Sequence, residues 1–291
     1  MGAGLGSLPH GSNLRLRLRQ TRATNARPLS RLLYALVLSA VSLLVVGAAV
    51  AQAKLSKGGG TPTGYDVSYP QCGGALPTNV SFAMVGINDG IVFSANPCAG
   101  NELAWAERYE SVPILYANTA DPGAALSSHW PTGQTTPQAC SASDTNSSAC
   151  SYDYGWNAAA DSYRDAVNAY VSLGQLPAGA TQTPQPNEWW LDVESANSWE
   201  SNTSNNVSEL QGEVAYLQSQ GVTALGFYAN ASDWQTITNG TTAFRSLPSW
   251  RPGAGSQRTA ASFCGTNGVT GGPTRYSQYA SGGFDADVRC S

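Results

Sequence analysis

Short apolar runs alternate with longer amphipathic segments after residue 63, and this alternation limits the folds open to the chain. Runs of strand length are predicted at residues 64–68, 81–88, 112–117, 189–194 and 222–229. Helical patterns are predicted at residues 101–110, 153–174, 206–221 and 232–238. Strands separated by helices pair in parallel, so this order predicts a parallel barrel or an open α/β sheet. The signals then weaken, and candidates for further short strands are residues 247–250, 259–263 and 275–279.

The N-terminal 53 residues are not expected to belong to this fold. Six arginines precede an apolar run at residues 32–50, and Ala51-Gln52-Ala53 fits a signal-peptidase site. We expect export with cleavage after Ala53, or else an uncleaved transmembrane anchor with its basic side in the cytoplasm. Both alternatives place the remaining chain outside the cytoplasm. A short linker at residues 54–63 then leads into one domain at residues 64–291.

The charge of the exported part argues against nucleic acid as a partner. Beyond Ala53 the chain has nine Lys and Arg residues against 19 Asp and Glu residues, a formal charge of about −10. Phosphate binding requires a basic surface, which this composition does not provide.

Six cysteines also lie in the exported part, and their even number suggests disulfides in an oxidising compartment. Six cysteines allow 15 connectivities. Pairing of nearest neighbours would give Cys72–Cys98, Cys140–Cys150 and Cys264–Cys290. The second of these pairs would staple residues 120–150, a polar segment that we predict to be a long ordered loop.

The run at residues 189–194 ends in two acids, and these are the first candidates for chemistry. In a strand, Trp190, Asp192 and Glu194 would share one face. Close carboxylates repel, so the pKa of one rises while the other remains ionised, as acid-assisted cleavage of a glycosidic bond requires. The alternative is a strand that ends in two solvated acids. Asp66 also lies near a strand end, where β/α barrels carry their chemistry.

Other catalytic groups are scarce in the exported part. Its single histidine, His129, lies in the polar loop, and no G-x-S-x-G motif accompanies it. No phosphate-binding glycine loop follows a strand, and no C-x-x-C pair suggests a zinc site. We therefore expect carboxylates to act without a metal or cofactor.

Aromatic side chains could supply a surface for sugar rings. Trp190, Tyr228 and Trp234 are the candidates near the predicted strand ends. The alternative for each of them is packing in the core.

Four motifs, in order, resemble those of the family 25 glycoside hydrolases, which are bacterial and phage muramidases. The motifs are Gly64-Tyr65-Asp66-Val67-Ser68-Tyr69-Pro70-Gln71, Leu191-Asp192-Val193-Glu194, Gly226-Phe227-Tyr228-Ala229-Asn230 with Trp234, and Tyr276-Ser277-Gln278-Tyr279 followed by Gly282-Gly283-Phe284-Asp285-Ala286-Asp287. Their order and approximate spacing agree from residue 64 to the end of the chain.

The resemblance implies a modified (β/α)8-type TIM barrel that cleaves the β-1,4 bond of N-acetylmuramic acid in peptidoglycan. Glu194 would be the general acid. Asp192 would stabilise the charged intermediate, with the option of orienting the acetamido group of the substrate. Asp66 would lie near the reaction centre, and Asp285 or Asp287 would complete the acidic rim.

Two segments depart from the family pattern. Ile87-Asn88-Asp89-Gly90 replaces a segment that resembles Lys-Ala-Thr-Glu in the family, and Asp89 is therefore a candidate for substrate contact. Tyr116-Ala117-Asn118 ends the third strand, where the family has an aromatic residue followed by His or Phe. These departures bear on the substrate more than on the fold.

Two functions remain open from the sequence. The first is an exported, monomeric hydrolase of cell-wall glycan, and the second is a catalytically weak barrel that binds envelope polysaccharide. An open cleft lined by Asp66, Asp192 and Glu194 would favour the enzyme. A stapled loop that blocks the cleft, or a structural ion pair of Glu194, would favour the binding module. A secreted α/β domain of unrelated function is the third possibility.

Overall fold

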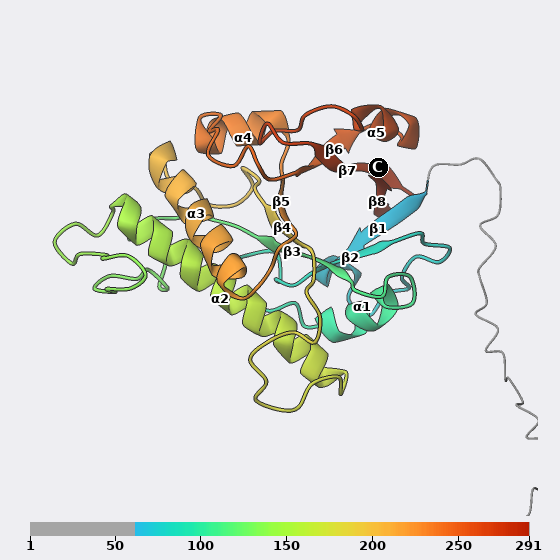
Figure 1. The fold of residues 1–291 in the computed structure, drawn as a ribbon, viewed down its shortest axis with the longest axis horizontal. Helices are drawn as coiled ribbons and strands as arrows, with labels where there is room; N and C mark the ends of the chain where they lie inside the picture. Colours follow the sequence, from blue (N-terminus) through green and yellow to red (C-terminus); the bar gives the residue numbers. More distant parts are fainter. Residues whose placement is uncertain (1–61, 291) are drawn as a thin grey trace, which may run out of the picture. The chain divides into compact units, whose positions relative to one another are not determined.

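Residues 62–290 are described in the computed structural model, and they form a closed eight-stranded barrel (Figure 1). The strands are β1 (Thr63–Val67), β2 (Ala83–Gly86), β3 (Ile114–Asn118), β4 (Trp189–Asp192), β5 (Leu225–Tyr228), β6 (Ser249–Ala254), β7 (Thr274–Ser281) and β8 (Phe284–Arg289). Neighbours from β1 to β7 pair in parallel, whereas β8 is antiparallel to both β7 and β1. The predicted modified β/α barrel is therefore confirmed.

The antiparallel strand arises from a tight hairpin. Gly282 and Gly283 connect β7 to β8, with φ angles of +64° and +88°. Positive φ at both central residues is what a two-residue hairpin turn needs, and glycine adopts it without steric cost. The chain therefore reverses between β7 and β8 instead of crossing over through a helix.

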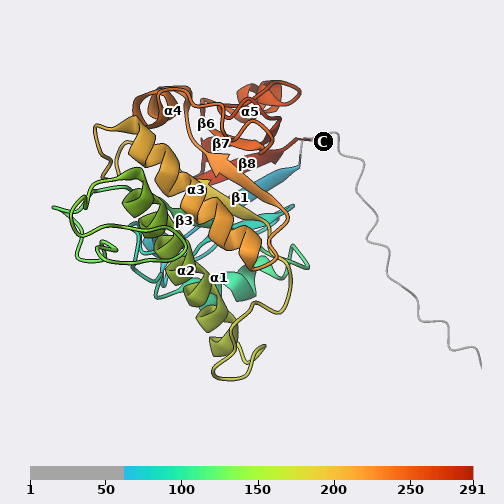
Figure 2. The same cartoon turned by 60° about the vertical axis from the view of Figure 1, so that its left-hand side comes forward.

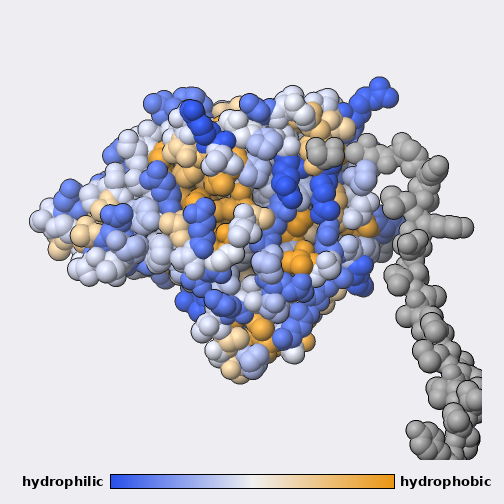
Figure 3. All heavy atoms as spheres, in the orientation of Figure 1, coloured by the Kyte–Doolittle hydropathy of each residue, from blue (hydrophilic) through white to orange (hydrophobic). Residues whose placement is uncertain are grey.

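The helices cover the outside of the barrel. They are α1 (Ala99–Ala106), α2 (Ser148–Ser172), α3 (Thr203–Ser219), α4 (Ala231–Thr238) and α5 (Gln257–Phe263). The long helices α2 and α3 lie side by side in both ribbon views (Figures 1 and 2). The visible surface is mainly hydrophilic, and apolar residues show in recesses between the polar ones (Figure 3).

Two details of the predicted elements change. Residues 259–263 were expected as a strand but belong to α5, because the Ser256 hydroxyl caps this helix by accepting a hydrogen bond from the Thr259 amide at 3.2 Å. A seven-residue helix gives too short an apolar pattern to distinguish it from a strand. Residues 284–289 form β8, which the sequence alone did not indicate.

Side chains of β4 alternate between the barrel interior and the helices, as predicted. Trp189 and Leu191 pack in the outer core, where Trp189 stacks on Tyr163 of α2 with 6.0 Å between ring centroids. Trp190 instead packs inside the barrel. The interior cluster contains Phe82, Met84, Ile114, Trp190, Tyr228, Trp250 and Tyr276.

Glycines on neighbouring strands make room for these interior rings. A Cβ at Gly226 would overlap the six-membered ring of Trp190, and a Cβ at Gly64 would overlap the Phe82 ring. Below the rings, Glu188 accepts hydrogen bonds from Trp190 Nε1 at 3.1 Å and from the Tyr276 hydroxyl at 3.3 Å. The barrel is thus filled at this level.

Three disulfides brace the loops, and each joins nearest neighbours in sequence as predicted. They are Cys72–Cys98, Cys140–Cys150 and Cys264–Cys290. No helix among residues 62–290 has the length and apolar character to cross a membrane. The predicted signal peptide or anchor lies outside the described residues.

Helices α2 and α3 touch through their backbones above a group of buried acids. A Cβ at Gly155 would overlap the Glu209 carbonyl, and a Cβ at Gly212 would overlap that of Tyr152. Glu209 and Glu213 of α3 are buried beside Asp121, which follows β3. Burial raises the pKa of Asp121 to about 7 and that of Glu213 to about 8. The charge of Glu200 adds to the pKa shift of Asp121, and the charges of Glu213 and Asp121 add to that of Glu209, so protons are retained in this group.

We expect Gly226→Ala to lower the free energy of unfolding by about 1–3 kcal/mol, because an added methyl group overpacks the interior against Trp190. Denaturant unfolding followed by tryptophan fluorescence measures the change. Gly255→Ala is the matched control, since a Cβ at Gly255 meets no atom within 4 Å. An equal effect of the two substitutions would contradict the packing argument.

We expect the stability of the protein to fall as the pH rises from about 4.5 to about 8. Glu213 has its pKa raised from 4.5 to about 8, so the folded protein binds protons that the unfolded chain has lost. This contribution is complete below the unfolded pKa and is lost as the pH passes the folded one. Glu213→Gln should reduce the dependence of the melting temperature on pH. The control is Glu107→Gln, at a half-buried glutamate outside this group, which should leave the dependence as in the wild type. Parallel curves for wild type and Glu213→Gln would refute this assignment.

Candidate functional site

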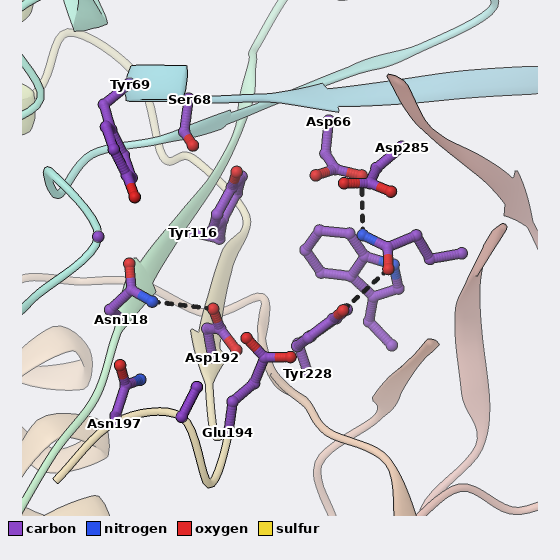
Figure 4. Close-up of a pocket in the computed structure, with 14 residues that line it drawn as sticks. Asp66, Ser68, Tyr69, Tyr116, Asn118, Asp192, Glu194, Asn197, Tyr228 and Asp285 are labelled. Atoms are coloured by element: carbon purple, nitrogen blue, oxygen red, sulfur yellow. Dashed lines mark hydrogen bonds between the residues drawn. The ribbon is translucent and has the colours of Figure 1, made fainter. Parts of the chain in front are cut away.

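A pocket of about 270 Å³ opens at the ends of the barrel strands where the parallel strands finish (Figure 4). Its acidic lining residues are Asp66, Asp192, Glu194 and Asp285. Its other lining residues are Ser68, Tyr69, Gly90, Tyr116, Asn118, Ala196, Asn197, Tyr228, Trp250 and Gln278. The three acids that were predicted to be catalytic therefore share one pocket.

Asp192 is the last residue of β4 and lies almost entirely buried on the pocket floor. Asn118 Nδ2 donates a hydrogen bond to Asp192 Oδ2 at 3.1 Å, and Oδ1 has no partner among the described residues (Figure 4). Burial raises the pKa of Asp192 well above its usual range, and the charges of Glu194 and Asp66 raise it further. Asp192 Oδ1 is thus both buried and without a hydrogen-bond partner among the described residues.

Glu194 follows β4 by two residues and is half-buried. Its backbone carbonyl accepts a hydrogen bond from Trp199 Nε1 at 2.8 Å, which holds the turn after the strand. Its carboxyl has no hydrogen bond or ion pair within residues 62–290, and it points into the pocket beside Asp192 (Figure 4). Burial and the charges of Asp233 and Asp285 raise the pKa of Glu194, so it retains a proton to higher pH than an exposed glutamate.

Asp66 faces these two residues across the pocket. Gln278 Nε2 donates a hydrogen bond to Asp66 Oδ2 at 3.1 Å, and the Tyr228 hydroxyl donates to Gln278 Oε1 at 2.8 Å. Burial, and then the charge of Asp285, raise the pKa of Asp66 to about 7. Gln278 thereby links an acid on β1 to a hydroxyl on β5.

The antiparallel strand decides which of the two C-terminal acids reaches the pocket. Asp285 pairs with Asp66 across the β8–β1 ladder and lines the pocket, whereas Asp287 pairs with Gly64, one layer deeper. Asp287 is fully buried and accepts a hydrogen bond from Trp250 Nε1 at 2.7 Å. Its other carboxyl oxygen, Oδ2, is buried without a hydrogen-bond partner among the described residues. Burial and the Asp66 charge raise the pKa of Asp287, which lies beneath Asp66 and does not line the pocket.

Three further candidates for substrate contact lie outside the pocket. Trp190 is buried one layer below Asp192, where its ring meets Tyr276 edge-on with 5.3 Å between centroids. Trp234 lies on α4, outside the barrel, and packs against Phe227. Asp89 is exposed and does not line the pocket, because the buried side chain of Asn88 faces α2, where its Nδ2 donates to Ser162 Oγ at 3.0 Å, and the next residue points to solvent. Of the predicted aromatic contacts, only Tyr228 lines the pocket.

Asn118 and Gln278 are two pocket residues for which the sequence predicted no role. Each of them orients an acid of the pocket through a side-chain amide. Asn118 is itself fixed, because its backbone amide donates to Asn88 Oδ1 at 2.7 Å. The departure at residues 116–118 was the available signal for Asn118, and the Tyr276–Tyr279 motif was the signal for Gln278.

The electrostatics of the pocket come from acids alone. Its lining includes no Lys, Arg or His residue. Carboxyls that lack a cation raise one another's pKa and hold protons in common. Such a group can donate a proton to a bound ligand while a neighbouring carboxylate remains negative. Within residues 62–290, no three His, Cys, Asp or Glu residues are arranged to hold a metal ion.

The chain is similar to proteins of the lysozyme type. A family model described as "Lysozyme-like protein 1" matches residues 167–263, which include Asp192 and Glu194. A search of curated proteins found no match.

Solved structures with similar folds include three lysozyme or glycosyl hydrolase proteins. A family GH25 lysozyme from Aspergillus fumigatus is 14% identical, with 80% of this chain and 95% of that chain covered and a TM-score of 0.47. A bacterial lysozyme from Streptomyces coelicolor is 16% identical, with 80% and 94% covered and a TM-score of 0.45. A glycosyl hydrolase 25 of Streptococcus pneumoniae is 18% identical, with 78% and 86% covered and a TM-score of 0.46. The lysozyme-like family model thus covers the central acidic motif, which is one of the four motifs that carry the resemblance in the sequence.

Proposed function

We propose that this protein is an exported glycoside hydrolase that cleaves β-1,4 bonds of peptidoglycan. The observation that carries the proposal is the Glu194 carboxyl, which faces an open pocket without a protein partner beside the buried Asp192. An unpaired carboxyl with a raised pKa can give its proton to the oxygen of a glycosidic bond. The lysozyme-like family match over the same segment supports this chemistry.

The roles of the acids follow from their positions. Glu194 protonates the leaving oxygen. The raised pKa of Asp192 means that it shares protons with its acidic neighbours. Once its own proton has passed to a neighbouring carboxyl or to solvent, ionised Asp192 stabilises the positive charge that develops at the anomeric carbon, or orients the acetamido group of the substrate to do so. Asn118 donates a hydrogen bond to one oxygen of Asp192 and so fixes the direction of the other. Asp66 and Asp285 form the opposite wall, where they can accept hydrogen bonds from sugar hydroxyls.

Two features favour an enzyme over a binding module. The loop at residues 120–150, which Cys140–Cys150 staples, contributes no residue to the lining of the acidic pocket. Glu194 takes part in none of the ion pairs among residues 62–290. The pocket is therefore accessible and its acid is not neutralised. The three disulfides suit the oxidising compartment that export would provide.

We expect Glu194→Gln to reduce the release of reducing ends from purified peptidoglycan by about 10²–10⁴-fold, because the amide cannot donate the proton. Glu107→Gln, on the outer surface near α1, is the matched control and should retain full activity. Equal release by the wild type and Glu194→Gln would show that Glu194 is not the acid. Absence of release by the wild type from every wall preparation would favour the binding module.

We expect the activity to fall as the pH rises through the raised pKa of Glu194, since only the protonated carboxyl donates. Asp233 is the first charge that raises this pKa, and it accepts a hydrogen bond from the Ser195 hydroxyl at 2.6 Å without lining the pocket. Asp233→Asn should therefore move the alkaline limb of the pH–rate profile to lower pH and leave the rate at the acidic optimum nearly unchanged. An unmoved alkaline limb would exclude Glu194 as the group that this limb reports.

A further inference from the structure

A second cavity of about 370 Å³ adjoins the acidic pocket. Ala196 and Asn197, in the turn after β4, line both, so the two cavities meet along this turn. The remaining walls of the second cavity come from residues 91–93, from Ala120, Pro122 and residues 126–129, from Tyr154 of α2 and from Ser198. Its volume lies within the range of ligand sites.

Exposed apolar side chains gather at these two cavities. Within residues 62–290, the large hydrophobic residues that are exposed are Tyr69, Ile91 and Leu126. Tyr69 lines the acidic pocket, and Ile91 and Leu126 line the second cavity. Ile91 is 63% exposed and Leu126 is 78% exposed. Large apolar side chains that remain in water and gather at one cavity, as Ile91 and Leu126 do, commonly mark a binding surface.

The walls of the second cavity are held in place. Phe93 adopts a φ angle of +58°, which is unusual for a bulky residue, and its ring stacks on His129 with 4.2 Å between centroids. Trp130 packs on Tyr154 with 5.0 Å between centroids, and its Nε1 donates to the Thr145 carbonyl at 2.6 Å. The Cys140–Cys150 disulfide closes the same loop onto α2. A wall that is fixed before binding loses little entropy on contact with a ligand.

The chemistry of the second cavity differs from that of the acidic pocket. Its lining has no Asp, Glu, Lys or Arg residue. Branched alkyl groups of Ile91 and Leu126 stand beside the hydroxyls of serines and the amide of Asn197. His129 already covers one face of the Phe93 ring, which reduces the flat aromatic surface available to a sugar. Alkyl groups with neutral hydrogen-bonding partners suit a peptide with small apolar side chains.

We propose that the second cavity binds the peptide that is attached to the wall glycan, next to the sugar held in the acidic pocket. This inference rests on the proposed function, because the shared turn at Ala196 and Asn197 connects it to the sugar site. The alkyl side chains of the peptide pack on Ile91 and Leu126, and its amide groups bond to Asn197 and the neighbouring hydroxyls. The protein thereby distinguishes peptide-bearing glycan from bare glycan.

The test measures binding by calorimetry to the full chain carrying Glu194→Gln, which prevents turnover. The ligands are the disaccharide of N-acetylglucosamine and N-acetylmuramic acid, with and without an attached alanyl-isoglutamine. Each ligand carries one carboxylate, so the two differ in the peptide and not in charge. We expect the peptide-bearing ligand to bind about 10-fold more tightly, as the burial of a few alkyl groups would provide.

In the Glu194→Gln protein, the additional substitutions Ile91→Ser and Leu126→Ser should abolish the tighter binding of the peptide-bearing ligand. They should leave the affinity for the bare disaccharide unchanged. The conservative substitutions Ile91→Val and Leu126→Met should retain the tighter binding of the peptide-bearing ligand. Equal melting temperatures of the serine variant and its Glu194→Gln parent would exclude misfolding. Equal affinities for the two ligands, or a preference that persists in the serine variant, would overturn the inference while leaving the proposed function intact. Absence of binding to both ligands, with no reducing ends released by the wild type, would overturn the two together.

Discussion

The packing of aromatic rings against glycines inside the barrel determines what the upper rim can contain. Trp190 occupies the space that a side chain at position 226 would need, and Phe82 does the same at position 64. These rings fill the lower interior, where Glu188 bonds to Trp190 and Tyr276. The next inward positions along β1 and β4 are Asp66 and Asp192. Their carboxyls therefore stand above a layer of buried aromatic rings, and the buried Asp287 also lies beneath Asp66.

Desolvation of this kind gives the pocket its character. Burial removes water from these carboxyls, and no cation lines the pocket, so their pKa values are raised. Hydrogen bonds from neutral amides, such as those of Asn118 and Gln278, orient the acids without neutralising them. The same physical situation recurs under the α2–α3 crossing, where Glu209 and Glu213 are buried beside Asp121. There the acids are enclosed by packed helices, whereas the barrel acids open to a cavity.

The loops beyond the strands extend the acidic pocket in one direction. The turn at Ala196 and Asn197 has the acidic pocket on one side and an uncharged cavity on the other. Residues 91–93, which follow the departing segment at residues 87–90, and residues of the stapled loop supply walls of this second cavity. Two adjoining sites of different chemistry fit a substrate that has both a glycan and a peptide part.

Local signals in the sequence determined a good part of this protein. The strand–helix alternation indicated a barrel or an open sheet, the family resemblance implied the barrel itself, and the period of two in residues 189–194 placed Asp192 on the inner face. The position of strand ends brought Asp66, Asp192 and Glu194 together, and nearest-neighbour pairing of the cysteines was correct. These features depend on short-range periodicity and on the common direction of parallel strands.

Only the tertiary structure decided which layer of the barrel each candidate side chain occupies and whether it reaches the pocket. Asp285 and Asp287 share a face of β8, and the antiparallel register alone puts the first in the pocket and the second beneath it. Trp190 also faces inward, but its layer is filled by rings from other strands, and Trp234 packs outside the barrel. Asn88 is buried against α2, and this orientation leaves the next residue, Asp89, at the surface. A sequence records which face a side chain takes, whereas the layer it occupies depends on what distant strands place above and below it.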